Sequence, residues 1–328
     1  MPAEGLTFGL HGAAGILAQH YGLVGRIATL TAERDENFRV SAAGGAFVLK
    51  VFAPETPLDE AEMLSEVLRH LEANAPDLPV PRLALASGGE PVVRLPDGRG
   101  GQRFAVLYSF MPGRPMMDSV RSARQAHGCG VLAARLALAL RDFSHPAMHR
   151  RLIWDLRRRP ELREVAASLP EVPFAHFVMP FIERFAGETG AQLEMLPMQF
   201  GHNDLNARNV IVDSNNDDVP TGIIDFGDAI HTARACDIAI ALVGQMHHPD
   251  SAERMMEAFT AGYDVISPLS PGERRLVPPL VAARIVQNVV MTAFYQRKAP
   301  KSQHFAGFDN SYFGWRIAFA EKLDARFA

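Results

Sequence analysis

Two short segments of the sequence carry the side chains best suited to chemistry with a metal ion and a hydroxyl group. In the first, Gly201–Val210, the pattern H-x-D-L-x-x-x-N places Asp204 five positions before Asn209. In the second, Gly222–Asp228, Asp225 begins the triplet D-F-G after three residues suited to a β-strand. Carboxylate and amide oxygens are the hard ligands that Mg²⁺ prefers, and a carboxylate within hydrogen-bond reach of a hydroxyl can accept its proton. These residues therefore predict a metal-assisted reaction at a hydroxyl group.

A predicted hairpin connects the two segments. Ile211–Val212 forms its first strand, the polar run Asn215–Asp218 its turn, and Gly222–Ile224 its return strand. Since a hairpin brings the chain back to where it started, we expect Asp225 to lie close to Asn209. Either motif alone arises by chance in many proteins, but their order and the hairpin-sized spacing between them make the combination specific.

Together the two motifs match the catalytic-loop and metal-loop pattern of protein kinases and kinase-like phosphotransferases. The segments "HNDLNARNVIVD" and "GIIDFGDAIHTARACDIAIAL" resemble the aminoglycoside phosphotransferase / choline kinase-like superfamily of small-molecule kinases, and within it the hydroxylysine kinase branch most of all. The segments "ERDENFRV", "FVLKVF" and "HRRLIWDLR" are similar to that branch as well, so the resemblance spans roughly Thr31 to Leu242. Beyond Leu242 the chain is similar only in its helical character and in the stretch "NSYF" near Tyr312.

This resemblance assigns roles to four residues. It implies that Asp204 is the catalytic base, that Asn209 and Asp225 hold Mg²⁺, and that Lys50 reaches the α- and β-phosphates of the nucleotide. Phosphoryl transfer needs metal ions that bridge the phosphates and a carboxylate next to the attacking hydroxyl. The implied phosphoryl donor is ATP, or GTP in its place, and the implied partner is a small-molecule hydroxyl acceptor.

Three further residues near the motifs are expected to have supporting roles. His202 is expected to support the loop that carries the base. Asp228 either faces the substrate or caps a turn, and the sequence favours neither reading. Asp237 is expected to start the following helix and to brace the loop.

The usual partner of the strand lysine in such kinases is a glutamate on the first helix, and three glutamates are available here. At about 100° per residue, only Glu60 lies near the apolar stripe of this helix, whereas Glu62 and Glu66 point away from it. Helical phase therefore predicts that Lys50 pairs with Glu60.

The turn between the first two strands departs from the protein-kinase pattern. It runs from Thr31 to Asn37 without a G-x-G-x-x-G motif, and no A-P-E motif follows the D-F-G. The turn is similar instead to that of the small-molecule kinases, in which backbone amides and polar side chains such as Asn37 cover the phosphates. A protein kinase is therefore disfavoured.

The elements expected around these motifs form an α+β, two-lobed protein-kinase-like fold. We expect a small N-terminal nucleotide-binding lobe over residues 1–107, an antiparallel sheet with one helix. A hinge follows over residues 108–114, and residues 107–111, which overlap its start, are expected to offer backbone groups to adenine. A larger helical catalytic and substrate-binding lobe covers residues 115–328. Strands are predicted over 27–30, 37–40, 46–52, 91–95 and 104–110, and helices over 58–73, 119–143 (with Ser119 as N-cap), 152–169, 173–188 and from 235 onward.

Composition argues against several classes of protein. The chain has 328 residues, of which 48% are apolar, so disorder is disfavoured. A net charge of −4, from 33 Lys and Arg against 37 Asp and Glu, argues against a nucleic-acid binder. The two distant cysteines exclude a C-x-x-C redox or zinc site. Because we see neither a signal peptide nor about 18 consecutive apolar residues, we expect a cytoplasmic protein without a membrane span, and the sequence leaves its oligomeric state open.

The charge of the C-terminal region bears on which acceptor is phosphorylated. From Ala229 onward, nine Asp and Glu residues stand against eleven Lys and Arg, a local charge of +2. That balance suits an acceptor with its own carboxylate better than a polycationic aminoglycoside. We therefore expect a hydroxylated amino acid or amino alcohol such as hydroxylysine, with Arg284 or Arg297 either clamping the carboxylate or lying in solvent. The alternatives are an aminoglycoside/antibiotic phosphotransferase, a non-catalytic kinase-like binding protein, and a nucleotide hydrolase.

Overall fold

The computed structural model describes residues 8–32, 34–98, 100–299 and 308–325 of the chain. These described residues form two compact units, one within residues 8–112 together with 145–147, and the other within residues 113–144 together with 148–325. The chain passes from the first unit to the second between Pro112 and Gly113. The assignment of residues 108–114 as a hinge stays a prediction.

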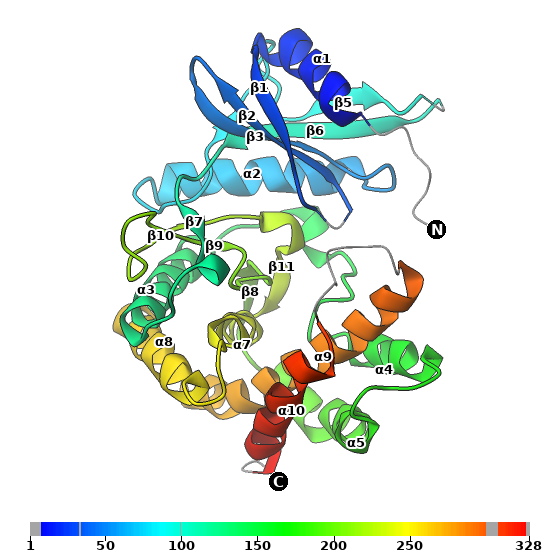
Figure 1. Cartoon of the computed structure of the whole chain (residues 1–328), viewed down its shortest axis with the longest axis vertical. Helices are drawn as coiled ribbons and strands as arrows, with labels where there is room; N and C mark the ends of the chain where they lie inside the picture. Colours follow the sequence, from blue (N-terminus) through cyan, green and yellow to red (C-terminus); the bar gives the residue numbers. More distant parts are fainter. Residues whose placement is uncertain (1–7, 33, 99, 300–307, 326–328) are drawn as a thin grey trace. The chain divides into compact units, whose positions relative to one another are not determined.

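The first unit is built on one antiparallel sheet, drawn in blue and cyan in Figure 1. Its strand order is β1-β2-β3-β6-β4, and β5 pairs with β6. The predicted strands are confirmed with small shifts at their ends, and a short sixth strand, β4, is added to them. The bounds are β1 Gly25–Leu30, β2 Glu36–Ala42, β3 Gly45–Val51, β4 Leu83–Ala84, β5 Val93–Pro96 and β6 Gln102–Ser109.

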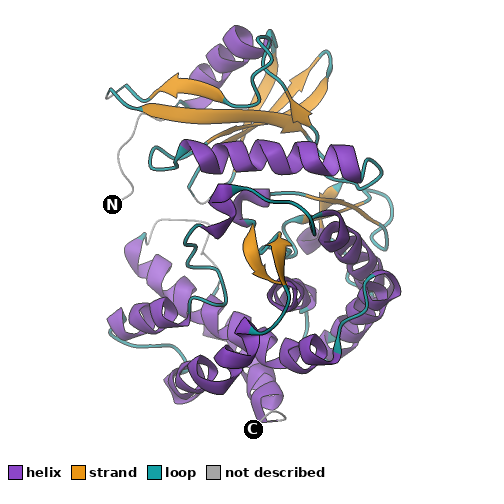
Figure 2. Cartoon of the chain, turned by 180° about the vertical axis from the view of Figure 1, so that it is seen from behind, coloured by secondary structure: helices purple, strands orange, loops and turns teal. Residues whose placement is uncertain are grey.

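Two helices lie on opposite faces of this sheet (Figures 1 and 2). Helix α2, Leu58–Asn74, confirms the helix predicted from apolar periodicity, and it buries that apolar stripe. Helix α1, Gly9–Tyr21, was not predicted. It contains three glycines, which are poor helix formers, so packing rather than intrinsic propensity stabilises it. Its buried residues Ile16 and Leu17 belong to the same core as Phe38 of β2.

The second unit combines helices with two small sheets. Strand β8 (Met198–Gly201) pairs with β11 (Ile230–Ala233), and a three-stranded sheet has the order β10-β9-β7. In that sheet β9 (Val210–Val212) and β10 (Pro220–Ile223) form the predicted antiparallel hairpin, and β7 is Arg114–Pro115. The α-helices are α3 Ala123–Ala139, α4 Arg159–Ser168, α5 Ala175–Arg184, α6 Gly190–Glu194, α7 Arg234–Gln245, α8 Ala252–Ile266, α9 Pro271–Lys298 and α10 Asn310–Ala325.

The structure corrects the bounds of three predicted helices. Helix α3 begins at Ala123 rather than at 119, and its N-cap is Ser122, whose side chain accepts a hydrogen bond from the Gln125 N–H. The Ser119 hydroxyl instead accepts a hydrogen bond from the Gln125 side chain. The helix predicted from residue 152 starts only at Arg159, since a proline in the first turn favours that start. The third, predicted over 173–188, is α-helical over 175–184 and passes into a π-helical turn over 185–189.

Helix α9 runs through the core of the second unit. By its length and its apolar composition alone, this helix could cross a membrane, although no such helix was expected from the sequence. However, 83% of its most apolar window is buried inside the protein, as in the core helix of a globular unit. A capping box fixes its start, because Ser270 and Glu273 exchange hydrogen bonds. Arg234 holds Glu273 from α7 with a second pair of hydrogen bonds.

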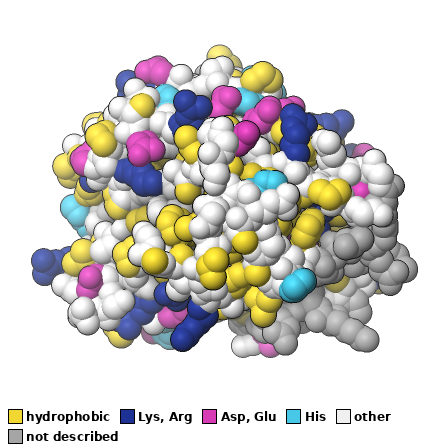
Figure 3. All heavy atoms as spheres, turned by 90° about the horizontal axis from the view of Figure 1, so that it is seen from above, with side chains coloured by type: hydrophobic (Ala, Val, Ile, Leu, Met, Phe, Trp, Pro, Cys, Tyr) yellow, Lys and Arg dark blue, Asp and Glu magenta, His cyan; other side chains and the backbone are white. Residues whose placement is uncertain are grey.

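The surface carries both signs of charge. On the face shown in Figure 3, Lys and Arg side chains lie among those of Asp and Glu. This mixture agrees with the small net charge of the sequence. That the chain binds no nucleic acid stays a prediction.

Candidate active site

The loop that follows β8 is held in place from α7. Asp237, in the first turn of α7, is buried and accepts two backbone hydrogen bonds from the loop. Its Oδ1 accepts from the Asn203 N–H at 2.7 Å, and its Oδ2 from the His202 N–H at 3.2 Å. Asn203 adopts φ = 60°, a left-handed conformation that asparagine tolerates better than most residues. The predicted bracing role of Asp237 is therefore confirmed.

His202 connects this loop to the strand before the D-F-G triplet. Its Nε2 lies 3.0 Å from the Ile224 carbonyl, and its Nδ1 accepts a hydrogen bond from the Asp204 N–H at 3.2 Å. One ring nitrogen therefore donates and the other accepts, which requires the neutral imidazole. Complete burial lowers the pKa of His202 and favours the same neutral form. The structure thus places His202 as a support between the two motifs.

Asp204 and Asn209 lie in direct contact. The Asn209 side-chain amide donates to Asp204 Oδ2 at 2.7 Å and to the Asp204 carbonyl at 2.9 Å. The other carboxylate oxygen, Oδ1, accepts from the Asn206 amide at 2.9 Å. Oδ1 also lies 3.3 Å from Nη2 of Arg284, which is a residue of α9. Both oxygens of the carboxylate are therefore held by donors of the second unit.

Asp225 comes back beside Asn209 through the hairpin, as predicted. The Ile224 N–H, one residue before Asp225, donates to the Asn209 carbonyl at 2.9 Å. Asp225 is exposed and adopts φ = 63°, a conformation that a non-glycine residue keeps only when the surroundings enforce it. Its Oδ1 accepts from the Gly227 N–H, and Arg150 donates to the Gly227 carbonyl. These contacts fix the direction of the Asp225 carboxylate.

Three carboxylates share this part of the second unit. Removal from bulk water raises the pKa of Asp204 to about 8, with the negative charges of Asp228 and Asp225 adding to the effect and Arg284 opposing it. Asp228 thus lies close enough to Asp204 and Arg284 to influence both charges. A cation bound among these groups would lower the pKa of Asp204 and favour its ionised form, the form that can accept a proton. A contact of Asp228 with the substrate stays a prediction.

The donor set fits Mg²⁺. Asn209 uses Nδ2 for both bonds to Asp204, so its Oδ1 is the atom that a cation would contact, and Asp225 offers carboxylate oxygens. Among the residues that the structure describes, no three His, Cys, Asp or Glu side chains form a group able to hold a metal ion. Mg²⁺ is commonly held by one or two protein oxygens together with substrate phosphates and water, and Asn209 and Asp225 can offer two such oxygens.

In the first unit, Lys50 lies at the end of β3 and is 4% exposed. Its Nζ forms an ion pair with Asp35 Oδ2 at 2.6 Å, and Asp35 Oδ1 accepts from the Ala53 N–H. Asn37 lies directly opposite Lys50 in the β2–β3 register and therefore on the same face of the sheet. The Oδ1 atom of Asn37 is buried and has no hydrogen-bond partner within the described ranges.

The three candidate glutamates of α2 differ in their surroundings. Glu60 and Glu62 are half-buried, while Glu66 is exposed and lies 3.9 Å from His145 Nε2. The pairing of Lys50 with Glu60 stays a prediction. Asp35, which the sequence analysis treated only as part of a turn, is the ion-pair partner of Lys50 that the structure adds.

Arg284 is the second residue whose position the sequence analysis did not find. Of the two candidate clamps for an acceptor carboxylate, Arg284 is buried and points at Asp204, whereas Arg297 is exposed in the last turn of α9. No local pattern links Arg284 to the loop, because 80 positions separate it from Asp204. The sequence feature that could have drawn attention to Arg284 is that it is a charged residue within the most apolar stretch of α9.

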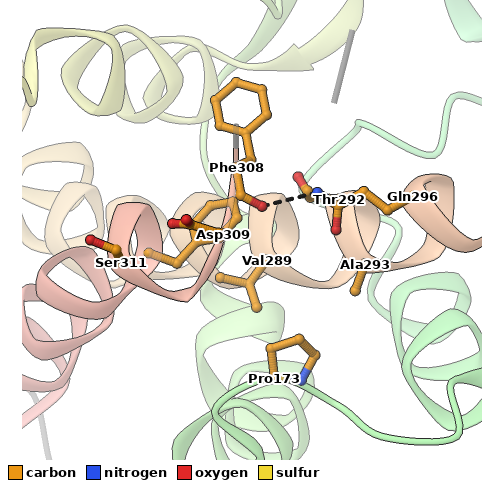
Figure 4. Close-up of a pocket in the computed structure, with 9 residues that line it drawn as sticks. Pro173, Val289, Thr292, Ala293, Gln296, Phe308, Asp309 and Ser311 are labelled. Carbon is orange, nitrogen blue, oxygen red and sulfur yellow. Dashed lines mark hydrogen bonds between the residues drawn. The ribbon is translucent and has the colours of Figure 1, made fainter. Parts of the chain in front are cut away.

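A cavity of about 410 Å³ lies beside the C-terminal half of α9 in the second unit. Figure 4 shows Thr292 and Gln296 on α9, with Phe308, Asp309 and Ser311 across from them. The Gln296 side chain donates to the Phe308 carbonyl at 3.0 Å. A few polar groups set among apolar side chains are typical of a small-molecule site.

Comparisons with known proteins place this geometry in context. A sequence model described as the phosphotransferase enzyme family matches residues 27–276, more than half of the chain. Hydroxylysine kinase of Mus musculus is 28% identical over 306 residues, which cover 86% of this chain and 81% of that protein. The structure of a microcompartment-associated aminopropanol kinase superposes with a TM-score of 0.76 at 19% identity, covering 96% and 97% of the two chains. An amicoumacin kinase in complex with AMP-PNP and Ca²⁺ superposes with a TM-score of 0.72 at 15% identity, covering 97% and 94%.

Proposed function

We propose that this chain, which belongs to the phosphotransferase enzyme family, transfers the γ-phosphoryl group of ATP to a hydroxyl group of a small amino acid or amino alcohol. The observation that carries the proposal is the convergence of Asp204, Asn209 and the D-F-G segment in the second unit. A carboxylate beside two oxygen ligands for Mg²⁺ is what phosphoryl transfer to an alcohol requires.

Each residue receives one task in this proposal. Asp204 accepts the proton of the acceptor hydroxyl, and Asn209 and Asp225 hold Mg²⁺. Lys50 contacts the phosphates of the nucleotide from the first unit, with Asn37 beside it on the same face of the sheet. Bound Mg²⁺ would offset the negative charge that the phosphates bring. ATP is the proposed donor, and GTP is the alternative to be tested beside it.

Two observations support the proposed acceptor class: the charge of the C-terminal region and the names of similar proteins. The region from Ala229 onward carries nine acidic against eleven basic residues, so it does not favour a polycation. The relative from mouse is named for hydroxylysine and the similar structure for aminopropanol, both of which carry an amino group and a hydroxyl. The cavity lies further along α9 than Arg284, since Thr292 in its lining follows Arg284 by eight residues, a rise of roughly 12 Å.

The test is a panel of acceptors assayed with Mg·ATP and with Mg·GTP. Hydroxylysine, homoserine, 1-amino-2-propanol and an aminoglycoside are compared, and both nucleoside diphosphate release and the phosphorylated product are measured. We expect product with a small amino acid or amino alcohol. Turnover with the aminoglycoside alone would overturn the acceptor class, and diphosphate release without phosphorylated acceptor would indicate a hydrolase.

The matched variant for this panel is Asp204→Asn. Loss of the base lowers turnover by about 10²- to 10⁴-fold, while binding of the nucleotide remains. A non-catalytic binding protein would show no turnover in the wild type and no change in the variant.

A further inference from the structure

Arg284 is a buried cation that the proposed reaction does not yet use. It lies in α9 and is 6% exposed, within a segment whose other side chains are largely apolar. Its Nη2 atom lies 3.3 Å from Oδ1 of Asp204. A buried charge is costly unless it is paired, so its retention in this core requires an explanation.

The guanidinium group is fixed from two sides. Its Nη1 atom donates to Gln287 Oε1 at 2.9 Å and lies 3.5 Å from the Trp154 carbonyl. The Trp154 ring lies against it, with Cζ of Arg284 5.0 Å from the ring centroid. Gln287 is itself buried and donates to the Ile153 carbonyl at 3.0 Å. Gln287 on the same helix and the segment 153–154, which is distant in sequence, therefore hold Arg284 in one orientation.

The contacts of the Asp204 carboxylate show what this orientation achieves. Asn209 holds one carboxylate oxygen, while Asn206 and Arg284 hold the other. Both asparagines belong to the same short loop as Asp204 and move with it, so Arg284 is the contact that ties the carboxylate to the helical core. Its positive charge also opposes the repulsion from nearby Asp228.

We propose that Arg284 is a positioning residue that fixes the Asp204 carboxylate for attack by the acceptor hydroxyl, rather than a clamp for a carboxylate on the acceptor. The proposal rests on the proposed function, in which Asp204 is the base. A clamp would present both terminal nitrogens to the ligand. In the structure Nη1 and Nη2 are both directed at groups of the protein itself.

The decisive variant is Arg284→Met, assayed with hydroxylysine, which carries a carboxylate, and with 1-amino-2-propanol, which does not. We expect kcat to fall by about tenfold to a hundredfold, as for other residues that orient a reacting group, and by the same factor for both acceptors. KM for either acceptor and Kd for Mg·ADP should stay within about threefold of the wild type. Arg284→Lys keeps the charge but not the planar fork, so its kcat should lie between those of the wild type and Arg284→Met. The matched control is Arg275→Met, an exposed arginine on the same helix, which should leave all these constants unchanged.

Each other outcome has one meaning. A rise in KM confined to hydroxylysine, with kcat unchanged, would show a carboxylate clamp and overturn the proposal, as would wild-type kinetics in Arg284→Met. Gln287→Met removes the support of Arg284 without removing its charge, so it should lower kcat by a smaller factor at unchanged KM, and it decides the matter if Arg284→Met unfolds. Failure of the proposed function is recognised separately, as an inactive wild type or as full turnover in Asp204→Asn.

Discussion

The two units each hold a charged group for which the proposed reaction has a use, and they hold it in different ways. Lys50 in the first unit pairs with Asp35, which lies in the turn directly before β2, the strand that pairs with the strand of Lys50. Asp204 in the second unit meets Arg284 from a helix 80 positions away. The first pair is local, so a movement of that one turn would be enough to open it for the phosphate contact that we propose for Lys50. The second pair is fixed by the packing of the core, which suits a base that must keep one direction.

The strongest test of this comparison removes the lysine. In Lys50→Met the Asp35 carboxylate is left in a site that shields it from water, and loss of one partner of a buried pair costs about 3–5 kcal/mol of unfolding free energy. The double variant Lys50→Met/Asp35→Asn should recover most of that stability and none of the turnover. Urea unfolding and the acceptor assay measure the two effects. Equal stability of the single and double variants would show that the pair is not a buried one in solution.

Removing the brace of the catalytic loop tests the other side of the comparison. Asp237→Asn leaves one acceptor where two backbone N–H groups now bind, and an unsatisfied buried group costs about 1–3 kcal/mol. We expect a lower thermal midpoint and a fall in kcat, since His202 and Asn203 hold the segment that carries Asp204. Asp250→Asn, at an exposed position of the same unit, is the control. An unaltered kcat in a destabilised Asp237→Asn protein would separate the brace from catalysis.

The same comparison explains what the sequence could predict. The order H-x-D-L-x-x-x-N, hairpin, D-F-G is local, so it was possible to place Asn209 and Asp225 side by side before the structure was known. The partner of Lys50 was in principle accessible too. A two-residue turn sets the β2–β3 register, and that register brings the residues just before Asn37 close to the end of β3.

Arg284 and helix α1 mark the limit of such reasoning. The contact of Arg284 with Asp204 depends on how α9 packs, which no spacing in the sequence encodes. Helix α1 has three glycines and is stabilised by burial against β1 and β2 rather than by propensity. The start of α3 was wrong because two serines, Ser119 and Ser122, both suit an N-cap, and only the contacts of Gln125 distinguish them.

A smaller effect is expected where the ion pair of the first unit competes with the nucleotide. Burial opposes the ionisation of Asp35, but the charge and hydrogen bond of Lys50, the Ala53 N–H and the charge of Arg34 together outweigh it and hold the pKa of Asp35 below its usual value. Asp35→Asn keeps an acceptor for the Ala53 N–H and removes a negative charge that competes with phosphate for Lys50, so Kd for Mg·ADP should fall by about threefold to tenfold. Isothermal titration calorimetry measures it. Weaker binding would mean that Asp35 positions Lys50 for the phosphates instead of competing with them.

The smallest effect is expected at the ion pair between Arg234 and Glu273, which has no part in the proposed reaction. Burial alone would raise the pKa of Glu273, but hydrogen bonds from Arg234 and Ser270 lower it below 4.5. A carboxyl group with a depressed folded pKa contributes stability above its unfolded pKa and loses it as the pH falls through the folded value. Glu273→Gln should therefore cost about 1 kcal/mol at pH 7, since charged hydrogen bonds are roughly twice as strong as neutral ones, and the cost should shrink below pH 4.5. Urea unfolding across this pH range measures the loss of stability, and Glu257→Gln, at an exposed position, is the control. A loss that does not depend on pH would show that packing at Glu273, rather than its charge, stabilises the start of α9.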